Sequence, residues 1–180
     1  MTNKDDLLQH NAHFADTDAK RAVPEIPFVP NGQLYVITCI DPRVDPAAIL
    51  ELDLGDAIVA RNVGGRVTAS VLQDIAWISY LHEVKTPEAD WFDVAVIHHT
   101  DCGSALLADD QLRHDFATRG YDEAELARLP VLDPTTTVRA DVATLLDFPN
   151  LSARVRVSGY SYDIKTGLLT TAVAPRRRGN

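Results

Sequence analysis

The sequence predicts an α/β fold with a mostly parallel central sheet flanked by helices. Three short apolar runs, at 34–38, 57–60 and 92–97, do not alternate with polar residues, which is typical of strands buried on both faces. Between the second and third runs, residues 68–82 carry apolar side chains at helical spacing. Strands that alternate with helices in this way form parallel sheets covered on both faces.

The N-terminal segment 1–30 is predicted to form a helical arm. Its first 22 residues are polar and compatible with a helix, and their main apolar side chains are Leu7, Leu8 and Phe14. Such a segment can lie on the body of its own chain or on a second subunit. Three prolines then keep the backbone extended up to the first strand, at Pro24, Pro27 and Pro30.

The other elements follow from caps, periodicity and turn residues. Pro46 in the first turn favours a short helix over 46–52. Ser104 is a suitable N-cap for a helix that ends near Ala117. Residues 118–134 are expected to be irregular or partly helical, followed by a helix over 135–146. Two β-rich runs, 155–164 and 168–173, flank Lys165-Thr166-Gly167, which predicts a C-terminal β-hairpin.

Length and charge indicate one domain that does not bind nucleic acid. The 180 residues, 46% of them hydrophobic, suit a single domain over 31–175, followed by a basic tail at 176–180. The net charge of −9 argues against a phosphate backbone as partner. No apolar stretch approaches the ~20 residues of a membrane span, and the first residues lack the order of a signal peptide. The expected location is the cytoplasm, where thiols stay reduced.

The chain's two cysteines each follow a predicted strand. Cys39 follows the run at 34–38, and His99 and Cys102 close or follow the run at 92–97. Two thiolates and an imidazole provide three of the four ligands of a tetrahedral Zn²⁺ and leave one position open for chemistry. The alternative is that both cysteines are small core residues, but each ends a strand and has Asp or Gly nearby. His98 points to the other face of its strand, so we expect it to be packed or hydrogen-bonded.

An acidic and a basic residue lie directly after the first cysteine. A carboxylate at Asp41 can bind the metal, accept a proton from a water molecule on it, or orient that water. Arg43 can hold Asp41 by a bidentate contact that keeps it ionised and away from the metal. The alternative is a surface salt bridge of little energetic weight. Pro42 restricts Asp41 to an extended conformation, which helps to fix its direction.

Three motifs, in order along the chain, resemble the signature of the β-class carbonic anhydrases: Cys39-x-Asp41-x-Arg43, Arg61-Asn62-x-Gly64 and His99-x-x-Cys102-Gly103. The residues in and around these motifs are most similar to those of the short microbial branch of the family. The resemblance implies a Zn²⁺ held by Cys39, His99 and Cys102, with Asp41 and Arg43 as a catalytic dyad, and reversible hydration of CO₂ to bicarbonate. It also implies an arm that packs on a partner subunit, hence a homodimer or higher homo-oligomer. In some members the aspartate that matches Asp41 is a fourth zinc ligand in a closed, inactive state.

Two departures from the commonest family pattern leave the substrate open. Pro42 stands where a small Ser or Ala is usual, and Val63-Gly64-Gly65 replaces Ala-Gly-small. The branch also contains carbonyl sulfide hydrolases, and other relatives act on carbon disulfide. The loop residues expected to bind substrate or support the oxyanion are Asn62, Gly64, Gly65 and Gly103. A non-catalytic, zinc-stabilised module is a further alternative, whereas a thiol redox protein would need a CxxC pair, which the sequence lacks.

Overall fold

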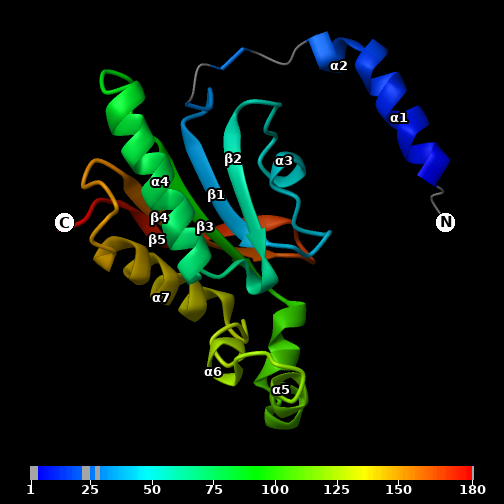
Figure 1. Ribbon diagram of the computed structural model, residues 1–180, viewed down its shortest axis with the longest axis vertical. Coiled ribbons are helices and arrows are strands. Elements are labelled where there is room, and N and C mark those ends of the chain that lie inside the picture. The colour runs from blue at the N-terminus through cyan, green and yellow to red at the C-terminus, as the bar shows by residue number, and fades with distance from the viewer. Residues whose placement is uncertain (1–3, 22–24, 27–28, 180) are drawn as a thin grey trace.

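The computed structural model describes residues 4–21, 25–26 and 29–179, and its centre is a five-stranded sheet (Figure 1). The strand order is β2-β1-β3-β4-β5, in which β1 (Leu34–Cys39), β2 (Ala57–Asn62), β3 (Asp93–His99) and β4 (Arg156–Asp163) are parallel. β5 (Leu168–Arg176) pairs antiparallel with β4. β1 and β3 are buried along nearly their whole length, which explains why their residues do not alternate. β2 is an edge strand without a fully buried residue, so the prediction that the run at 57–60 is buried on both faces is wrong. The predicted α/β class and the C-terminal hairpin are confirmed.

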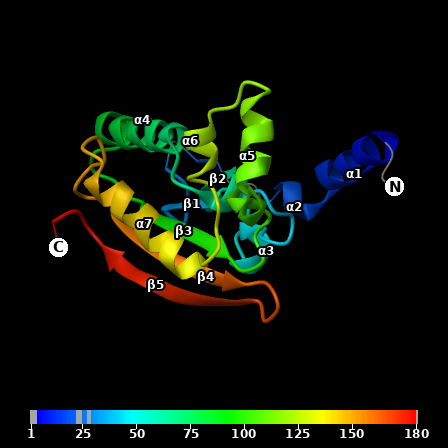
Figure 2. The same cartoon turned by 90° about the horizontal axis from the view of Figure 1, so that it is seen from below.

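Two helices cover one face of the sheet. α4 (Ala69–Lys85) and α7 (Pro134–Asp147) lie on the same side in both views (Figures 1 and 2). Their side chains pack with those of the central strands in the larger core, whose fully buried members include Ile37, Ile75, Val94, Val142 and Val157. The short helix α3 (Pro46–Ile49) contributes to a smaller cluster on the other face, around Val36, Val44, Ile97 and Tyr162. The chain therefore covers its second sheet face less completely.

Side-chain caps define where the two long helices begin. The Thr68 hydroxyl accepts a hydrogen bond from the backbone N–H of Val71 at the start of α4. Asp133 caps α7, in which Pro134 occupies the first position. Both helices therefore match the predicted segments within a few residues.

The predicted N-cap at Ser104 is wrong. After Cys102 the chain forms a 3₁₀ turn, η2 (Gly103–Ala108), and Asp109 then caps a separate helix, α5 (Asp110–Ala117). The Ser104 hydroxyl instead accepts a hydrogen bond from the distant backbone N–H of Val131. The intervening segment, expected to be partly helical, contains the single turn α6 (Glu123–Leu126).

The arm consists of α1 (Lys4–Asp16) and α2 (Asp18–Arg21), which stand away from the body in both views (Figures 1 and 2). Leu7 and Leu8 are 58% and 67% exposed, so the arm buries little of its apolar surface in its own chain. Pro30 is buried, whereas Pro24 and Pro27 lie outside the described residues. In the described part of the chain, no helix combines the length and the apolar character needed to cross a bilayer.

Candidate metal centre

The carboxyl ends of three neighbouring strands bring the predicted site residues together. β1 lies between β2 and β3 and ends at Cys39, whose register partner on β2 is Asn62. β3 ends at His99, and Cys102 follows in the turn before η2. In open parallel sheets, ligands bind at this edge, where connections leave in opposite directions. Segments that are far apart in the sequence therefore meet at one point.

Two sulfurs and one imidazole nitrogen form a cluster that can hold a metal ion. Cys39, His99 and Cys102 are buried, and one ligand atom of each lies within 4.8 Å of the others. The two Sγ atoms are 3.8 Å apart, whereas a disulfide needs about 2.05 Å. A tetrahedral ion with two Zn–S bonds of about 2.3 Å separates its sulfurs by about 3.8 Å. The cluster therefore has the spacing that such an ion requires.

A hydrogen bond fixes how His99 faces the cluster. Its Nδ1 lies 2.9 Å from the carbonyl oxygen of Thr100, so Nδ1 carries the proton and donates, and Nε2 keeps a free lone pair. Nε2 is buried and has no hydrogen-bond partner among the described residues. A buried nitrogen without a partner is costly, and a metal ion bound to it would remove that cost.

The cluster carries negative charge that a cation would neutralise. The hydrogen bond with Cys102 and burial raise the pKa of the Cys39 thiol. The hydrogen bond with Cys39, joined by the interactions with the His99 ring and with Ser104, outweighs burial and lowers the pKa of Cys102 to about 3. Burial opposes charge on His99, but the neighbouring Cys102 sulfur raises the imidazole pKa. One thiolate is therefore stable by itself, and a divalent cation would stabilise the second.

The loop after β2 approaches the first cysteine because it contains two glycines. In the turn η1 (Val63–Gly65), Gly64 and Gly65 have φ angles of 77° and 66°, in the left-handed region that favours glycine. A Cβ on Gly65 would lie 2.7 Å from the backbone nitrogen of Cys39. The backbone N–H groups of Asp41 and Gly64 act to lower the pKa of the Cys39 thiol, and that of Asp41 donates to the sulfur at 3.4 Å. This close approach therefore supports the ligand directly.

The four loop residues predicted to bind substrate or an oxyanion make different contacts. Both polar atoms of the Asn62 side-chain amide are hydrogen-bonded to the backbone of Arg66: Nδ2 donates to its carbonyl at 2.7 Å, and Oδ1 accepts from its N–H at 2.8 Å. Gly64 and Gly103 line the cavity beside the sulfurs, whereas Gly65 lies against β1. Gly64 and Gly103 therefore lie at the cavity, whereas Asn62 and Gly65 support the loop.

His98 belongs to a buried polar network on the face opposite His99. Its Nε2 lies 3.1 Å from the Gly65 carbonyl oxygen and 3.2 Å from the Asp141 carboxylate. Arg66 donates to both oxygens of that carboxylate, at 2.8 and 3.0 Å. Burial acts to raise the pKa of Asp141, but the hydrogen bonds from His98 and Arg66 outweigh it and lower the pKa to about 2. This network attaches η1 to α7 behind the cluster.

Asp41 and Arg43 form a bidentate ion pair beside the cluster. The Nε and Nη2 atoms of Arg43 lie 3.0 and 2.7 Å from the two carboxylate oxygens, and its backbone N–H donates to Oδ1 at 2.9 Å. These hydrogen bonds lower the pKa of Asp41 to about 2. Pro42 does not prevent the pair. Asp41 is not among the groups gathered in the cluster, so this structure has the arrangement in which Arg43 holds the carboxylate.

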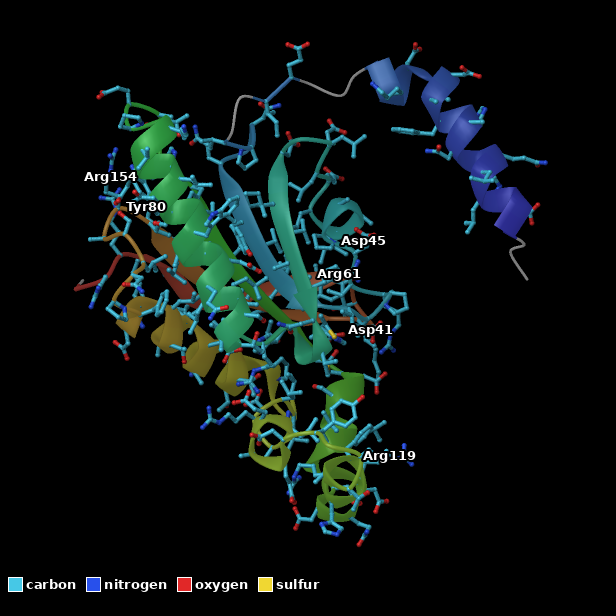
Figure 3. The ribbon with its side chains drawn as sticks, in the orientation of Figure 1. Asp41, Asp45, Arg61, Tyr80, Arg119 and Arg154 are labelled. Atoms are coloured by element: carbon cyan, nitrogen blue, oxygen red, sulfur yellow. The ribbon has the colours of Figure 1, made fainter. Side chains whose placement is uncertain are left out.

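Two further residues hold the pair in place. The Asp101 carboxylate accepts a hydrogen bond from Arg43 Nη1 at 2.9 Å. Arg61, at the end of β2, donates to the backbone carbonyls of Cys39 and Asp41 at 3.0 and 2.8 Å, and it lies close to Asp41 in Figure 3. Arg61 therefore connects the metal-ligand segment and the acid to the neighbouring strand.

A small cavity adjoins the cluster. It measures about 270 Å³ and is lined by Cys39, Ile40, Asp41, Pro42, Val63, Gly64, Gly103 and Ser104. Ile40 and Val63 are 55% and 39% exposed, so apolar side chains surround its opening. A larger hollow of about 510 Å³ lies at the other end of the molecule, beside Tyr80 (Figure 3). Of the two, only the smaller one adjoins the cluster.

Ser104 and Asp141 are site residues that the motif analysis did not identify. The sequence predicts a helix cap at Ser104, whereas its place two residues after Cys102 is the signal for a role beside the ligand. Asp141 lies within the apolar stripe of α7, between buried Val138, Val142 and Leu145. A lone acidic residue on a buried helix face indicates a partner from elsewhere in the fold, but the sequence does not say which one.

Comparison with known proteins identifies the family. A family model described as carbonic anhydrase matches residues 34–169. Beta-carbonic anhydrase 1 of Mycobacterium tuberculosis is 27% identical over 175 residues, which cover 94% of this chain and 97% of that protein. Carbon disulfide hydrolase of Acidianus sp. is 24% identical over 184 residues, which cover 86% of this chain and 87% of that protein. The crystal structure of carbonic anhydrase from Streptococcus mutans matches with a TM-score of 0.73 and 31% identity, covering 96% of this chain and 98% of that one. Because the family model spans most of the chain, this protein belongs to the β-carbonic anhydrase family of enzymes.

Proposed function

We propose that this chain catalyses the reversible hydration of CO₂ to bicarbonate at a zinc ion held by Cys39, His99 and Cys102. The main support is the buried ring of His99, whose Nε2 has no partner among the described residues and of which one nitrogen lies within 4.8 Å of two sulfurs that are 3.8 Å apart. Three ligands of this type leave a fourth zinc position for water or substrate. Thiolate and imidazole ligands also favour zinc over magnesium or calcium, which prefer oxygen.

The residues around the cluster suit acid–base control of a nucleophile. When bound, zinc would supply the Lewis acidity that makes water nucleophilic near neutral pH. Asp41, which Arg43 keeps ionised, can only accept hydrogen bonds. It would therefore hold the proton of the attacking oxygen and leave a lone pair directed at the substrate carbon. Arg61 holds the backbone that carries this carboxylate.

The cavity favours a small, linear, apolar substrate. Ile40, Pro42 and Val63 provide apolar contacts without hydrogen-bond donors. Gly103 also lines the cavity, and its backbone N–H can support developing negative charge. These contacts suit O=C=O, and they equally suit molecules of the same shape that contain sulfur.

Hydrolysis of carbon disulfide or carbonyl sulfide is the second candidate. The relative from Acidianus sp. is named carbon disulfide hydrolase, and the same ligands and acid can serve S=C=S or O=C=S. Both reactions release hydrogen sulfide, whereas CO₂ hydration does not. The product therefore separates the candidates.

A paired assay on one zinc-loaded preparation tests the proposal. Stopped-flow CO₂ hydration is measured beside sulfide release from carbonyl sulfide and carbon disulfide. Fast CO₂ hydration without sulfide supports the first candidate, and sulfide release with little hydration supports the second. Bound zinc with neither activity indicates the non-catalytic module. A metal analysis that finds no zinc in unchelated protein refutes the site.

Asp41→Asn tests the role of the acid, with Asp122→Asn as a matched control. Asp122 caps α6 through the N–H groups of Ala124 and Glu125, a role that Asn also fulfils. We expect Asp41→Asn to keep zinc but to lower turnover about 10²–10⁴-fold, and Asp122→Asn to leave turnover unchanged. Equal turnover in the two variants would exclude the proposed role.

We also propose a homo-oligomer in which the arm packs on a second copy of the chain. The exposed Leu7 and Leu8 of α1 need an apolar surface, and the sheet face that carries Val36 and Tyr162 is the less covered one. Two free cysteines held 3.8 Å apart fit a reducing compartment such as the cytoplasm.

A further inference from the structure

Ser104 is a buried hydroxyl residue that touches the metal-ligand cluster without belonging to it. Its Oγ lies 3.2 Å from the Cys102 sulfur and 3.1 Å from the backbone nitrogen of Val131. The residue is only 4% exposed, so water does not compete for either contact. The hydroxyl therefore links the ligand to a segment nearly thirty residues further along the chain.

The direction of both hydrogen bonds follows from the chemistry of the partners. The N–H of Val131 can only donate, so the Ser104 oxygen accepts from it. Metal ligation requires Cys102 as a thiolate, which has no proton to give. The hydroxyl proton of Ser104 must then be donated to the sulfur.

The surroundings keep the hydroxyl in this position. The side chain of Val131 packs against both cysteines. The carbonyl oxygens of Arg128 and Pro130 accept hydrogen bonds from Arg66, which holds the segment before Val131 against the site. On the other side, a Cβ on Gly64 would lie only 3.0 Å from the Ser104 oxygen. Little space remains for the hydroxyl to turn away.

We infer that Ser104 is a positioning residue for the metal, because its hydroxyl donates to the Cys102 thiolate, orients the sulfur and reduces the charge that the sulfur gives to the ion. This inference rests on the proposed zinc site and adds a residue that acts through one of its ligands. Hydrogen bonds to metal ligands typically change metal affinity about 10–100-fold. An effect of that size is measurable without any assay of turnover.

Ser104→Ala tests the inference, with Ser79→Ala as a matched control. Ser79 in α4 is 2% exposed and also accepts a backbone hydrogen bond, from Ser152 at 3.4 Å, but it does not contact the cluster. We expect Ser104→Ala to weaken zinc binding about 10–100-fold. In cobalt-substituted protein, its sulfur-to-metal charge-transfer band should move to longer wavelength, because a thiolate without the hydrogen bond gives up an electron more easily. Ser79→Ala should change neither property, and Ser104→Thr, which keeps the hydroxyl, should restore both.

The outcomes separate this inference from the proposed site. Wild-type zinc affinity and an unchanged cobalt spectrum in Ser104→Ala overturn the role of Ser104 alone. A wild-type protein that binds neither zinc nor cobalt overturns the metal site itself. If Ser104→Ala does not fold, Ser104→Cys takes its place, because a thiol is a weak donor of similar size. It should shift the band in the same direction, and an unshifted band would again overturn the inference.

Discussion

Replacement of Gly65 by alanine tests how closely the loop η1 supports the metal cluster. Gly65 has a φ of 66°, and a Cβ there would meet backbone atoms of β1: the nitrogen of Cys39 at 2.7 Å, and C and Cα of Thr38 at 2.7 and 2.9 Å. These atoms belong to a buried central strand and cannot rotate away like the end of a flexible side chain. Either the loop or the end of β1 must move.

The structure gives the expected cost. Alanine in the left-handed region costs about 1–2 kcal/mol, and overpacking of a buried site adds about 1–3 kcal/mol. The variant should therefore lose about 2–5 kcal/mol of unfolding free energy. Restoring an ordinary carbon contact of about 3.5 Å requires a shift of roughly 0.8 Å, which exceeds the tolerance of about 0.2 Å on metal–ligand distances. Zinc affinity should therefore fall as well.

Gly167→Ala is the matched control, because Gly167 has a φ of 72° but nothing within 4 Å of the added Cβ. It should lose only the conformational cost of about 1–2 kcal/mol and keep wild-type zinc affinity. Urea denaturation of both proteins without metal gives the stability difference, and competition with a chelator gives the zinc affinity. If Gly65→Ala matches Gly167→Ala in both measurements, the contact with β1 does not support the ligand and the reasoning fails.

Three further predictions follow from other contacts. Cys102→Ser should lose zinc and activity together, and zinc retained at wild-type affinity, measured by metal analysis, would contradict its role as a ligand. Asp141→Asn should cost about 3–5 kcal/mol near neutral pH, because Arg66 and His98 lose a charged buried partner. The pKa of Asp141 is about 2 in the folded protein, against an ordinary 3.8. The ionised carboxylate therefore stabilises the fold fully above pH 3.8, and this stabilisation is lost as pH falls through the folded-state pKa. The stability gap between Asp141→Asn and wild type, from urea titrations, should therefore narrow as pH falls from about 4 to about 2, and a constant gap would contradict this. Deletion of residues 4–21 should lower the number of subunits per particle, which light scattering gives from the mass. An unchanged number of subunits would show that the arm does not hold the oligomer together.

Local patterns in the sequence were sufficient for the α/β class and for the three groups of the cluster. Apolar runs without alternation indicate buried strands, and parallel strands have their carboxyl ends at one edge of the sheet. Cys39, His99 and Cys102 each lie at such an end, so their meeting follows from chain order and strand direction. Asp41 and Arg43 are two residues apart, and their pairing likewise needs only local geometry.

Contacts between distant segments required the tertiary structure. Asp109 caps α5, whereas the Ser104 hydroxyl accepts a hydrogen bond from Val131, and no local pattern distinguishes these two possible caps. Likewise, Asp141 is ionised inside the core because Arg66, His98 and the backbone N–H of Val67 reach it from other elements. A hydrogen bond between residues far apart in the chain depends on how the elements pack, and packing is a property of the whole fold. The sequence by itself therefore determined which atoms can bind a metal, and only the folded structure decided which side chains hold those atoms in place.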